Sequence, residues 1–383
     1  MPSFCPNHDH KVPGAATAQP LVSVVTPVHN TAEYLADCIR SVLAQSHPAW
    51  EYIIVNNAST DGSLEIAQSF AAIDPRIRII NTERLLPQIA NFNFALRQVS
   101  PVSRYCKMVL ADDWIYPNCL QEMVALAETD PEIAIVSAYF LWNRVVHGFG
   151  LSCDVPDKTT SVVTGRDVCR LYLLDGFYVL GSPNSVLYRS DLVRGRDPFF
   201  PESRYPGYFD DSQLCFEVLE RPKVGFVHQV LSYSRWGNES VTTSTTTDKM
   251  YEFMRYMFVH KYGTRYLTES EYRDTLAWID REYYSMLALS LFKGRGTKFW
   301  QFHTRGLEVA GSRLDWGRVA RMQLPRLLNL LGNPKRTVEG LWTYVRSLNL
   351  TKRWLSMQWM NRLPQPTSAP GFLDLPLTEE SVR

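Results

Sequence analysis

A regular alternation of short apolar runs with amphipathic segments between residues 21 and 110 constrains the fold more than any other feature. The apolar runs are short and rich in β-branched residues, which favours buried strands. They are Leu21–Thr26, Tyr52–Val55, Ile77–Ile80 and Lys107–Leu110. Apolar residues recur at helical spacing in the intervening segments 34–43, 64–67 and 91–99. Strands that alternate with helices through short connections predict a mostly parallel, Rossmann-like α/β sheet flanked by helices.

Beyond Asp130 the pattern changes. Mixed short strands and loops are expected as far as about Val241, and helices after that. One apolar stripe runs from Met250 to Phe258 and is expected to stop at Gly263, and a second runs from Val338 to Val345. We therefore divide the chain into a disordered arm (1–20), an α/β domain (21–248), a helical C-terminal region (249–363) and a flexible tail (364–383).

Composition and charge narrow the functional classes. The 45% apolar and 21% charged content is typical of a folded protein. Residues 1–248 carry a net charge of −8 and residues 249–383 one of +9, so the front half lacks the basic face of a general nucleic-acid binder. Seven scattered cysteines without a CxxC pair predict reduced thiols in a cytoplasmic protein. Neither a signal peptide nor an apolar run of about 18 residues is visible, so any membrane contact is expected from one side.

Two neighbouring carboxylates, Asp112 and Asp113, directly follow the run that ends at Leu110. Adjacent carboxylates repel each other unless a positive charge lies close by. Mg²⁺ or Mn²⁺ bridging the phosphates of a substrate is a common reason for such a pair. The alternative is that Asp113 caps a helix that begins near Pro117.

Two amides, Asn56 and Asn57, follow the second predicted strand and open a turn-rich stretch that ends at Ser63. A side-chain amide offers both a donor and an acceptor, and can therefore pair with the edge of a pyrimidine base. The same residue types are also favoured at turns and helix starts. We assign the later part of the stretch to such a turn.

Several motifs occur in a fixed order and spacing. They are Thr26–Asn30, Tyr34–Leu35, Ser41–Ser46, Val55–Ser63 and Ala111–Asp113. Together they resemble the family 2 glycosyltransferases, enzymes of the GT-A fold. The resemblance is strong from Leu21 to Pro117, weaker to Thr242 and absent beyond. It implies a UDP-, TDP- or GDP-sugar donor, a divalent metal (Mn²⁺ or Mg²⁺) and inversion at the anomeric carbon.

The resemblance also assigns roles to single residues. It places Asp112 at the ribose and Asp113 on the metal. The nucleotide-sugar residues that it implies are Pro27, His29, Asn30, Asn56, Asn57, Asn93, Asp112 and Asp113.

Three departures from the family pattern bear on this assignment. The family usually has an acidic residue at position 56, and the aspartate often found two residues before Asp112 is Leu110 here. A histidine metal ligand common in a later loop is missing from Tyr233–Ser240. Arg235 lies there instead and is expected to pair with the diphosphate or contact the acceptor.

An inverting transfer needs a base for the acceptor hydroxyl. Asp210 and Asp211 open an amphipathic helix where the family has its acidic pair, and Asp211 occupies the base position. Capping of that helix is the alternative. Gly181–Asn184 is expected to form the facing acceptor loop, with Asn184 and Asp210 as acceptor contacts, although an ordinary turn would use the same residues.

The basic C-terminal region mixes lysines, arginines and tryptophans between residues 293 and 362. That composition suits the surface of an anionic membrane. Packing on the catalytic domain and a homodimer surface are the alternatives, and we favour packing for most of the apolar stripes.

The sequence therefore predicts an inverting transfer from a nucleotide sugar, most simply a UDP-sugar, to a saccharide or lipid-linked acceptor. Bacterial surface polysaccharide or lipopolysaccharide synthesis is the setting expected by analogy. A nucleotidyltransferase ranks low, because Thr26–Asn30 is not a glycine-rich, basic phosphate loop. A non-catalytic nucleotide-sugar-binding or scaffold protein of the same fold remains the alternative.

Overall fold

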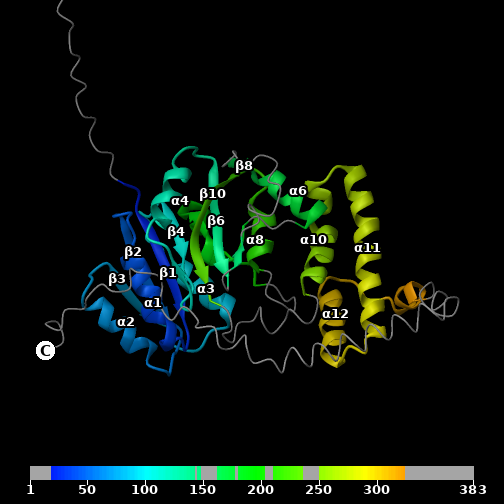
Figure 1. Ribbon diagram of the computed structural model, residues 1–383, viewed down its shortest axis with the longest axis horizontal. Helices are drawn as coiled ribbons and strands as arrows, with labels where there is room; N and C mark the ends of the chain where they lie inside the picture. The colour runs from blue at the N-terminus through cyan, green and yellow to red at the C-terminus, as the bar shows by residue number, and fades with distance from the viewer. Residues whose placement is uncertain are drawn as a thin grey trace, which may run out of the picture.

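The protein is described by a computed structural model, which covers residues 19–142, 145–147, 162–176, 180–202, 210–235 and 250–323. A ten-stranded sheet lies at its centre (Figure 1). Its strands are β1 (Val22–Val28), β2 (Trp50–Asn56), β3 (Ile77–Asn81), β4 (Tyr105–Met108), β5 (Trp114–Ile115), β6 (Ile133–Trp142), β7 (Val145–His147), β8 (Val162–Thr164), β9 (Val186–Arg189) and β10 (Lys223–Ser234). The main order is β3-β2-β1-β4-β9-β6-β10-β5, with β7 paired to β6 and β8 to β10.

The four predicted strands are confirmed as β1 to β4. They pair in parallel, with Val25 of β1 opposite Ile53 of β2 and Met108 of β4. Every residue of β1 and β4 is buried, so the uninterrupted apolar runs reflect a sheet that is covered on both faces.

The second half of the sheet differs from the expectation of short strands after Asp130. β6 has 10 residues and β10 has 12, and the two pair in parallel through register shifts near Val227 and Val230. Such shifts interrupt the two-residue alternation by which a strand is identified in a sequence. β9 runs antiparallel between β4 and β6, so the sheet is mixed although mostly parallel.

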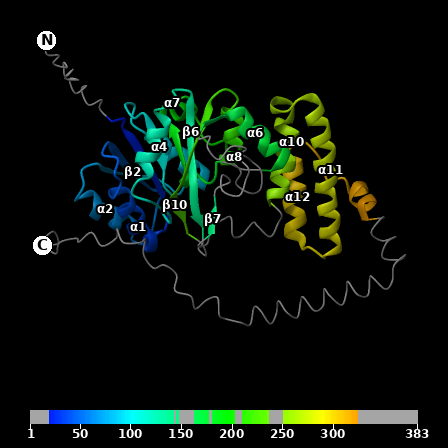
Figure 2. The same cartoon turned by 45° about the horizontal axis from the view of Figure 1, so that its top comes forward.

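Helices cover both faces. They are α1 (Ala32–Leu43), α2 (Ser63–Ala71), α3 (Gln88–Leu96), α4 (Cys119–Ala127), α6 (Gly165–Asp175), the 3₁₀ turn η1 (Pro183–Ser185), α7 (Ser190–Arg194), α8 (Asp210–Val218), α10 (Met250–Tyr266), α11 (Glu269–Phe292) and α12 (Thr297–Val309). α1, α2 and α4 share one apolar cluster with the sheet. α3, α6, α8 and α10 share the other, and α10, α11 and α12 form a bundle beside it (Figure 2).

The described C-terminal helices pack on the α/β core. Met250, Phe253 and Met257 are buried in the same cluster as α6 and α8, which confirms the packing interpretation for this stripe. The expected helix end at Gly263 was wrong, since α10 continues to Tyr266. A Cβ at Gly263 would lie 2.4 Å from the ring of Tyr272, so this glycine permits close helix packing.

Two further expectations are only partly covered by the described residues. The five cysteines among them are free and buried, in keeping with reduced thiols. In the described part of the chain, no helix combines the length and apolarity needed to cross a membrane. Residues 1–18 of the predicted arm, the stripe Val338–Val345 and the predicted tail 364–383 lie outside the described residues.

Candidate functional site

The predicted carboxylate pair and Arg235 lie where the parallel strands end. Asp112 and Asp113 form the turn between β4 and β5, and Arg235 directly follows β10. β5 pairs with the end of β10, with Trp114 opposite Tyr233, so these two segments are brought together across more than 100 residues of chain. Ligands of open α/β sheets bind at this carboxyl edge.

Asp113 is buried at this edge, with 4% of its surface exposed. Its carboxylate accepts hydrogen bonds from the Ser234 hydroxyl (3.1 Å) and from the Arg235 backbone N–H (2.8 Å). Burial and the charge of Asp112 raise its pKa well above the usual range. α4 begins at Cys119 with Asn118 at its N-cap, so Asp113 does not cap that helix.

Arg235 places a cation beside the carboxylate pair. Its guanidinium carbon lies 4.4 Å from the ring centre of Tyr34 and 5.1 Å from that of Trp114. Its Nε donates to the Asp112 backbone carbonyl oxygen (2.9 Å), and Nη2 lies 3.5 Å from a carboxylate oxygen of Asp37. The two rings and the hydrogen bonds fix the guanidinium plane. The sequence singles out Arg235 but not the rings that hold it.

Hydrogen bonds connect the turn after β1 to the turn after β2. Asn30 and Ala58 both have positive φ (50° and 51°), a conformation that costs energy in residues other than glycine and often occurs at functional sites. Asn30 Oδ1 accepts from the Thr60 N–H (2.8 Å), and a ring nitrogen of His29 lies 2.8 Å from the Asn57 carbonyl oxygen. Pro27 lies within β1 itself, one residue before its end.

Three of the predicted amides, those of Asn56, Asn57 and Asn93, bond to the protein itself. Asn56 donates to Asn81 Oδ1 (2.9 Å) and accepts from the Ser59 N–H (3.2 Å). Asn57 donates to the Leu86 carbonyl oxygen and accepts from the Leu86 N–H (2.9 and 2.8 Å). All three amide residues are at least 95% buried. These bonds shape the loop edge at which the predicted nucleotide site lies.

Asn93 makes the same kind of two-way bond on the other side of the sheet. It donates to the Phe200 carbonyl oxygen (2.9 Å) and accepts from the Phe200 N–H (2.8 Å). The structure thus assigns this amide to holding the segment that leads toward α8.

Asp210 and Asp211 are the first two residues of α8. Burial, together with the charge of Asp210, raises the pKa of Asp211 to about 6. The Ser212 N–H donates to the Asp211 carboxylate (2.6 Å), so Asp211 also accepts a bond at the helix start. The position of Asp211 is therefore compatible with a general base for the acceptor hydroxyl and also with a residue that caps the helix.

Asn184 lies in η1 and is fully buried. Its Nδ2 donates to the Tyr233 carbonyl oxygen (3.2 Å), next to the residue that bonds Asp113. The ammonium of Lys107, which the sequence marks only as a strand residue, donates to the backbone carbonyl oxygens of Asn184 and Val186. The predicted acceptor loop is thus attached to β4 and to β10.

The carboxylate pair suits a hard divalent cation that is shared with phosphates. Mg²⁺ and Mn²⁺ sites of this kind take one or two protein carboxylates and fill the remaining positions with phosphate oxygens and water. The described ranges contain no group of three His, Cys, Asp or Glu side chains placed to hold a metal. Asp113 would be the protein ligand that the resemblance implies, with Asp112 beside it at the ribose.

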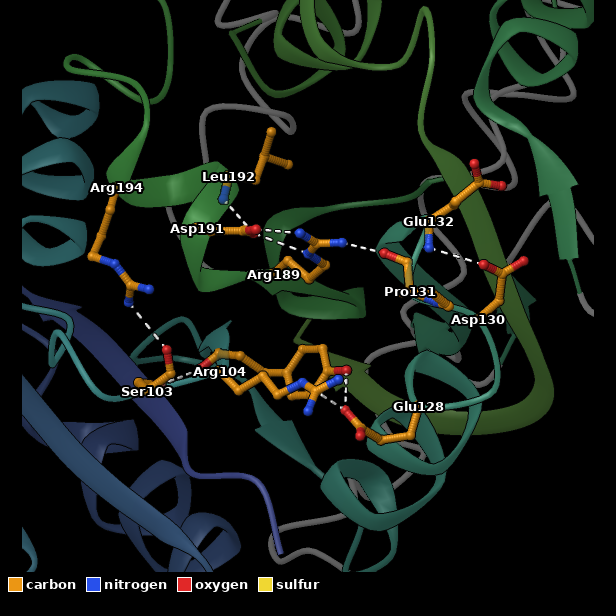
Figure 3. Close-up of polar contacts among 11 residues, drawn as sticks. Ser103, Arg104, Glu128, Asp130, Pro131, Glu132, Arg189, Asp191, Leu192 and Arg194 are labelled. Atoms are coloured by element: carbon orange, nitrogen blue, oxygen red, sulfur yellow. Dashed lines mark hydrogen bonds and ion pairs between the residues drawn. The ribbon is translucent and has the colours of Figure 1, made fainter.

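The opposite edge of the sheet carries charges of a different kind (Figure 3). Here β4, β6 and β10 begin, and basic and acidic side chains are paired. The pairs are Arg104–Glu128, Arg189–Asp191, Lys223–Asp130 and Lys223–Glu132.

Comparisons with known proteins relate the N-terminal part of the chain to one family. Residues 23–149 match the family described as Glycosyl transferase family 2. A putative teichuronic acid biosynthesis glycosyltransferase (TuaG) of Bacillus subtilis is 42% identical over 95 residues, 25% of this chain and 37% of that protein. An uncharacterized glycosyltransferase of Haemophilus influenzae is 26% identical over 201 residues, 52% of this chain and 60% of that protein. The chain thus spans less than two thirds of either relative.

A solved structure shares the fold. Residues 1–349 of TarS from S. aureus, crystallised with UDP-GlcNAc, superpose with a TM-score of 0.53 at 16% identity, covering 76% of this chain and 80% of that one. At that identity the likeness speaks for the GT-A fold alone, which agrees with the predicted fold class.

Proposed function

We propose that this chain, which matches the family 2 glycosyltransferases over residues 23–149, transfers a sugar from a nucleoside-diphosphate sugar to a saccharide or lipid-linked acceptor with inversion. The observation that carries the proposal is the buried carboxylate of Asp113 beside Asp112, at the edge where the parallel strands end. Two like charges held together in a place of low exposure are suited to a metal-bound diphosphate.

The chain's own residues divide the work. A divalent cation at Asp113 would supply charge neutralisation for the leaving diphosphate. Arg235 adds a fixed positive charge at the same turn. Asp211, with a pKa of about 6, is ionised at neutral pH and takes the acceptor's proton. The acceptor oxygen bonds to the anomeric carbon while the diphosphate leaves with the electron pair of the broken bond.

UDP is the proposed nucleotide, with TDP and GDP as alternatives. The structure that shares this fold holds UDP-GlcNAc. The name of the Bacillus subtilis relative, which refers to teichuronic acid, supports a role in cell-surface polysaccharide synthesis, with lipopolysaccharide as one possible product class. We propose that the enzyme acts in the cytoplasm at the inner face of the membrane. Peripheral membrane contact and a homodimer surface are proposed for the basic C-terminal region.

A thermal-shift panel tests the donor site. UDP, TDP, GDP, CDP and ADP are each added with and without Mn²⁺, because a ligand that binds only the folded state raises the melting temperature. We expect a Mn²⁺-dependent shift with UDP in the wild type, and its loss in Asp113→Ala. Absence of a shift with every nucleotide would contradict the proposal.

A non-catalytic nucleotide-sugar-binding protein is the second candidate. It is favoured by Asn56, where the family usually has an acidic residue, and by the absence of the family's histidine from Tyr233–Ser240. UDP binding without any UDP release from a UDP-sugar would identify it.

A further inference from the structure

Lys107 is a charged side chain that the proposed chemistry does not use. It lies in the middle of the sheet, between β1 and β9, and none of its surface is exposed. Its ammonium donates to the carbonyl oxygens of Asn184 and of Val186 (3.1 Å). Among the described residues no carboxylate forms an ion pair with it. A buried ammonium balanced only by carbonyl oxygens costs stability compared with an apolar side chain of similar size.

The contacts of Lys107 lead to the site in a closed path. Asn184 lies in η1, and its side chain donates to the Tyr233 carbonyl oxygen (3.2 Å). The next residue, Ser234, donates to the Asp113 carboxylate (3.1 Å). Asp113 follows Lys107 by six residues on the same strand and turn. One ring of contacts thus joins the predicted acceptor turn to the predicted donor carboxylate.

We propose that Lys107 is a positioning residue that fixes η1, and with it the acceptor turn Gly181–Asn184, relative to Asp113. The inference rests on the proposed function. A second observation supports it: Asn184 Oδ1 is buried and has no hydrogen-bond partner among the described residues, so η1 contains a polar atom that the fold itself leaves unused.

The expected consequence is specific to the acceptor. Without the ammonium, the carbonyl groups of η1 lose the donor that holds them, and the acceptor hydroxyl is no longer held at a fixed distance and angle from the anomeric carbon. Misplacement of one reactant slows a transfer strongly. The nucleotide side, which is formed by the turns after β1, β2 and β4, keeps its own hydrogen bonds.

Lys107→Met tests the proposal, with the exposed Lys298→Met as the matched control. UDP release from UDP-glucose and UDP-GlcNAc is measured with and without a panel of methyl glycosides. For Lys107→Met we expect glycoside-stimulated release to fall about tenfold or more through a higher glycoside KM, with hydrolysis in water and UDP affinity within about twofold of wild type. The melting temperature should stay within about 3 °C of wild type. Hydrogen exchange should be faster at the amides of residues 183–189 and unchanged in β1 and β2.

Two outcomes would overturn the proposal: unchanged exchange with unchanged transfer, or an equal loss of transfer, hydrolysis and melting temperature, which marks a merely structural side chain. If Lys107→Met does not fold, Lys107→Gln, whose shorter amide side chain cannot hold both carbonyl oxygens, should give the same pattern. A wild type that neither binds UDP nor releases it refutes the proposed function, and hydrogen exchange then decides whether Lys107 holds η1.

Discussion

The two edges of the central sheet treat charge in opposite ways. At the edge where β4, β6 and β10 begin, Arg104 lies 2.9 Å from Glu128 (Figure 3). Lys223, at the start of β10, lies 2.9 Å from Asp130. At the edge where β4 ends, two carboxylates lie side by side instead. Burial and the charge of Asp112 raise the pKa of Asp113 there. The first arrangement satisfies the fold by itself. The second holds a buried carboxylate whose pKa is raised well above its usual range, a cost that a bound cation can reduce, which is why we place function there.

The largest expected effect is at α8. Asp211→Asn should lower transfer about a thousandfold, because the acceptor hydroxyl loses its base, while UDP affinity stays near that of wild type. Steady-state transfer and UDP titration measure both quantities. Asp191→Asn, at the paired edge, is the matched control. Near-normal turnover of Asp211→Asn would show that Asp211 is not the base and that its role, like that of Asp191, is structural.

Asp113→Asn should have two effects of opposite sign. Metal-assisted transfer should fall about a hundredfold. Stability at pH 7 should rise by about 1 kcal/mol, because a raised folded-state pKa means that ionisation disfavours the fold. Denaturant unfolding and the thermal shift with UDP and Mn²⁺ measure the two. If Asp113→Asn is less stable than wild type, the Asp113 carboxylate does not cost stability, and the two edges do not differ in the way described.

The pH profile should follow Asp211. Its pKa of about 6 predicts that kcat/KM rises with pH up to about 6 and falls about tenfold per unit below it. The same raised pKa means that this carboxyl contributes most to stability below its unfolded value, and that the contribution is lost as the pH rises through about 6. An activity limb that is identical in wild type and Asp211→Asn would contradict the assignment.

The smallest effect is expected at the paired edge. Asp191→Asn should change stability at pH 7 by about 0.5 kcal/mol or less, because its ion pair with Arg189 is largely exposed. Arg189 lowers the pKa of Asp191, so its contribution is present above the unfolded pKa and is lost as the pH falls through the folded value. Stability curves of Asp191→Asn and Asp113→Asn should therefore differ from wild type in opposite pH directions.

The part of the fold that could be predicted is the part built from local patterns. β1 to β4 follow directly from apolar runs, and Asp112 and Asp113 are located by the strand that precedes them. The insertion of β9 between β4 and β6 depends on pairing across about 80 residues, which no local period encodes.

The same limit applies to the site. Arg235 is assigned to the site from the sequence. Its position beside the rings of Tyr34 and Trp114 could not be predicted, because it depends on contacts among three segments that lie far apart in the sequence. In the sequence, Lys107 cannot be distinguished from an exposed strand lysine. Its partners are backbone carbonyl oxygens, which every residue type has, so no partner residue can be recognised.

β10 connects the two edges, since it begins at Lys223 among the ion pairs and ends at Ser234 against Asp113. Its pairing with β6 slips twice between Val227 and Ser232. Such slips bend a strand locally and let its two parts keep different registers against the same neighbour. For protein engineering, this makes the middle of β10 a natural joint: the second half of the strand can be redesigned for new acceptors while the first half keeps its ion pairs and its register.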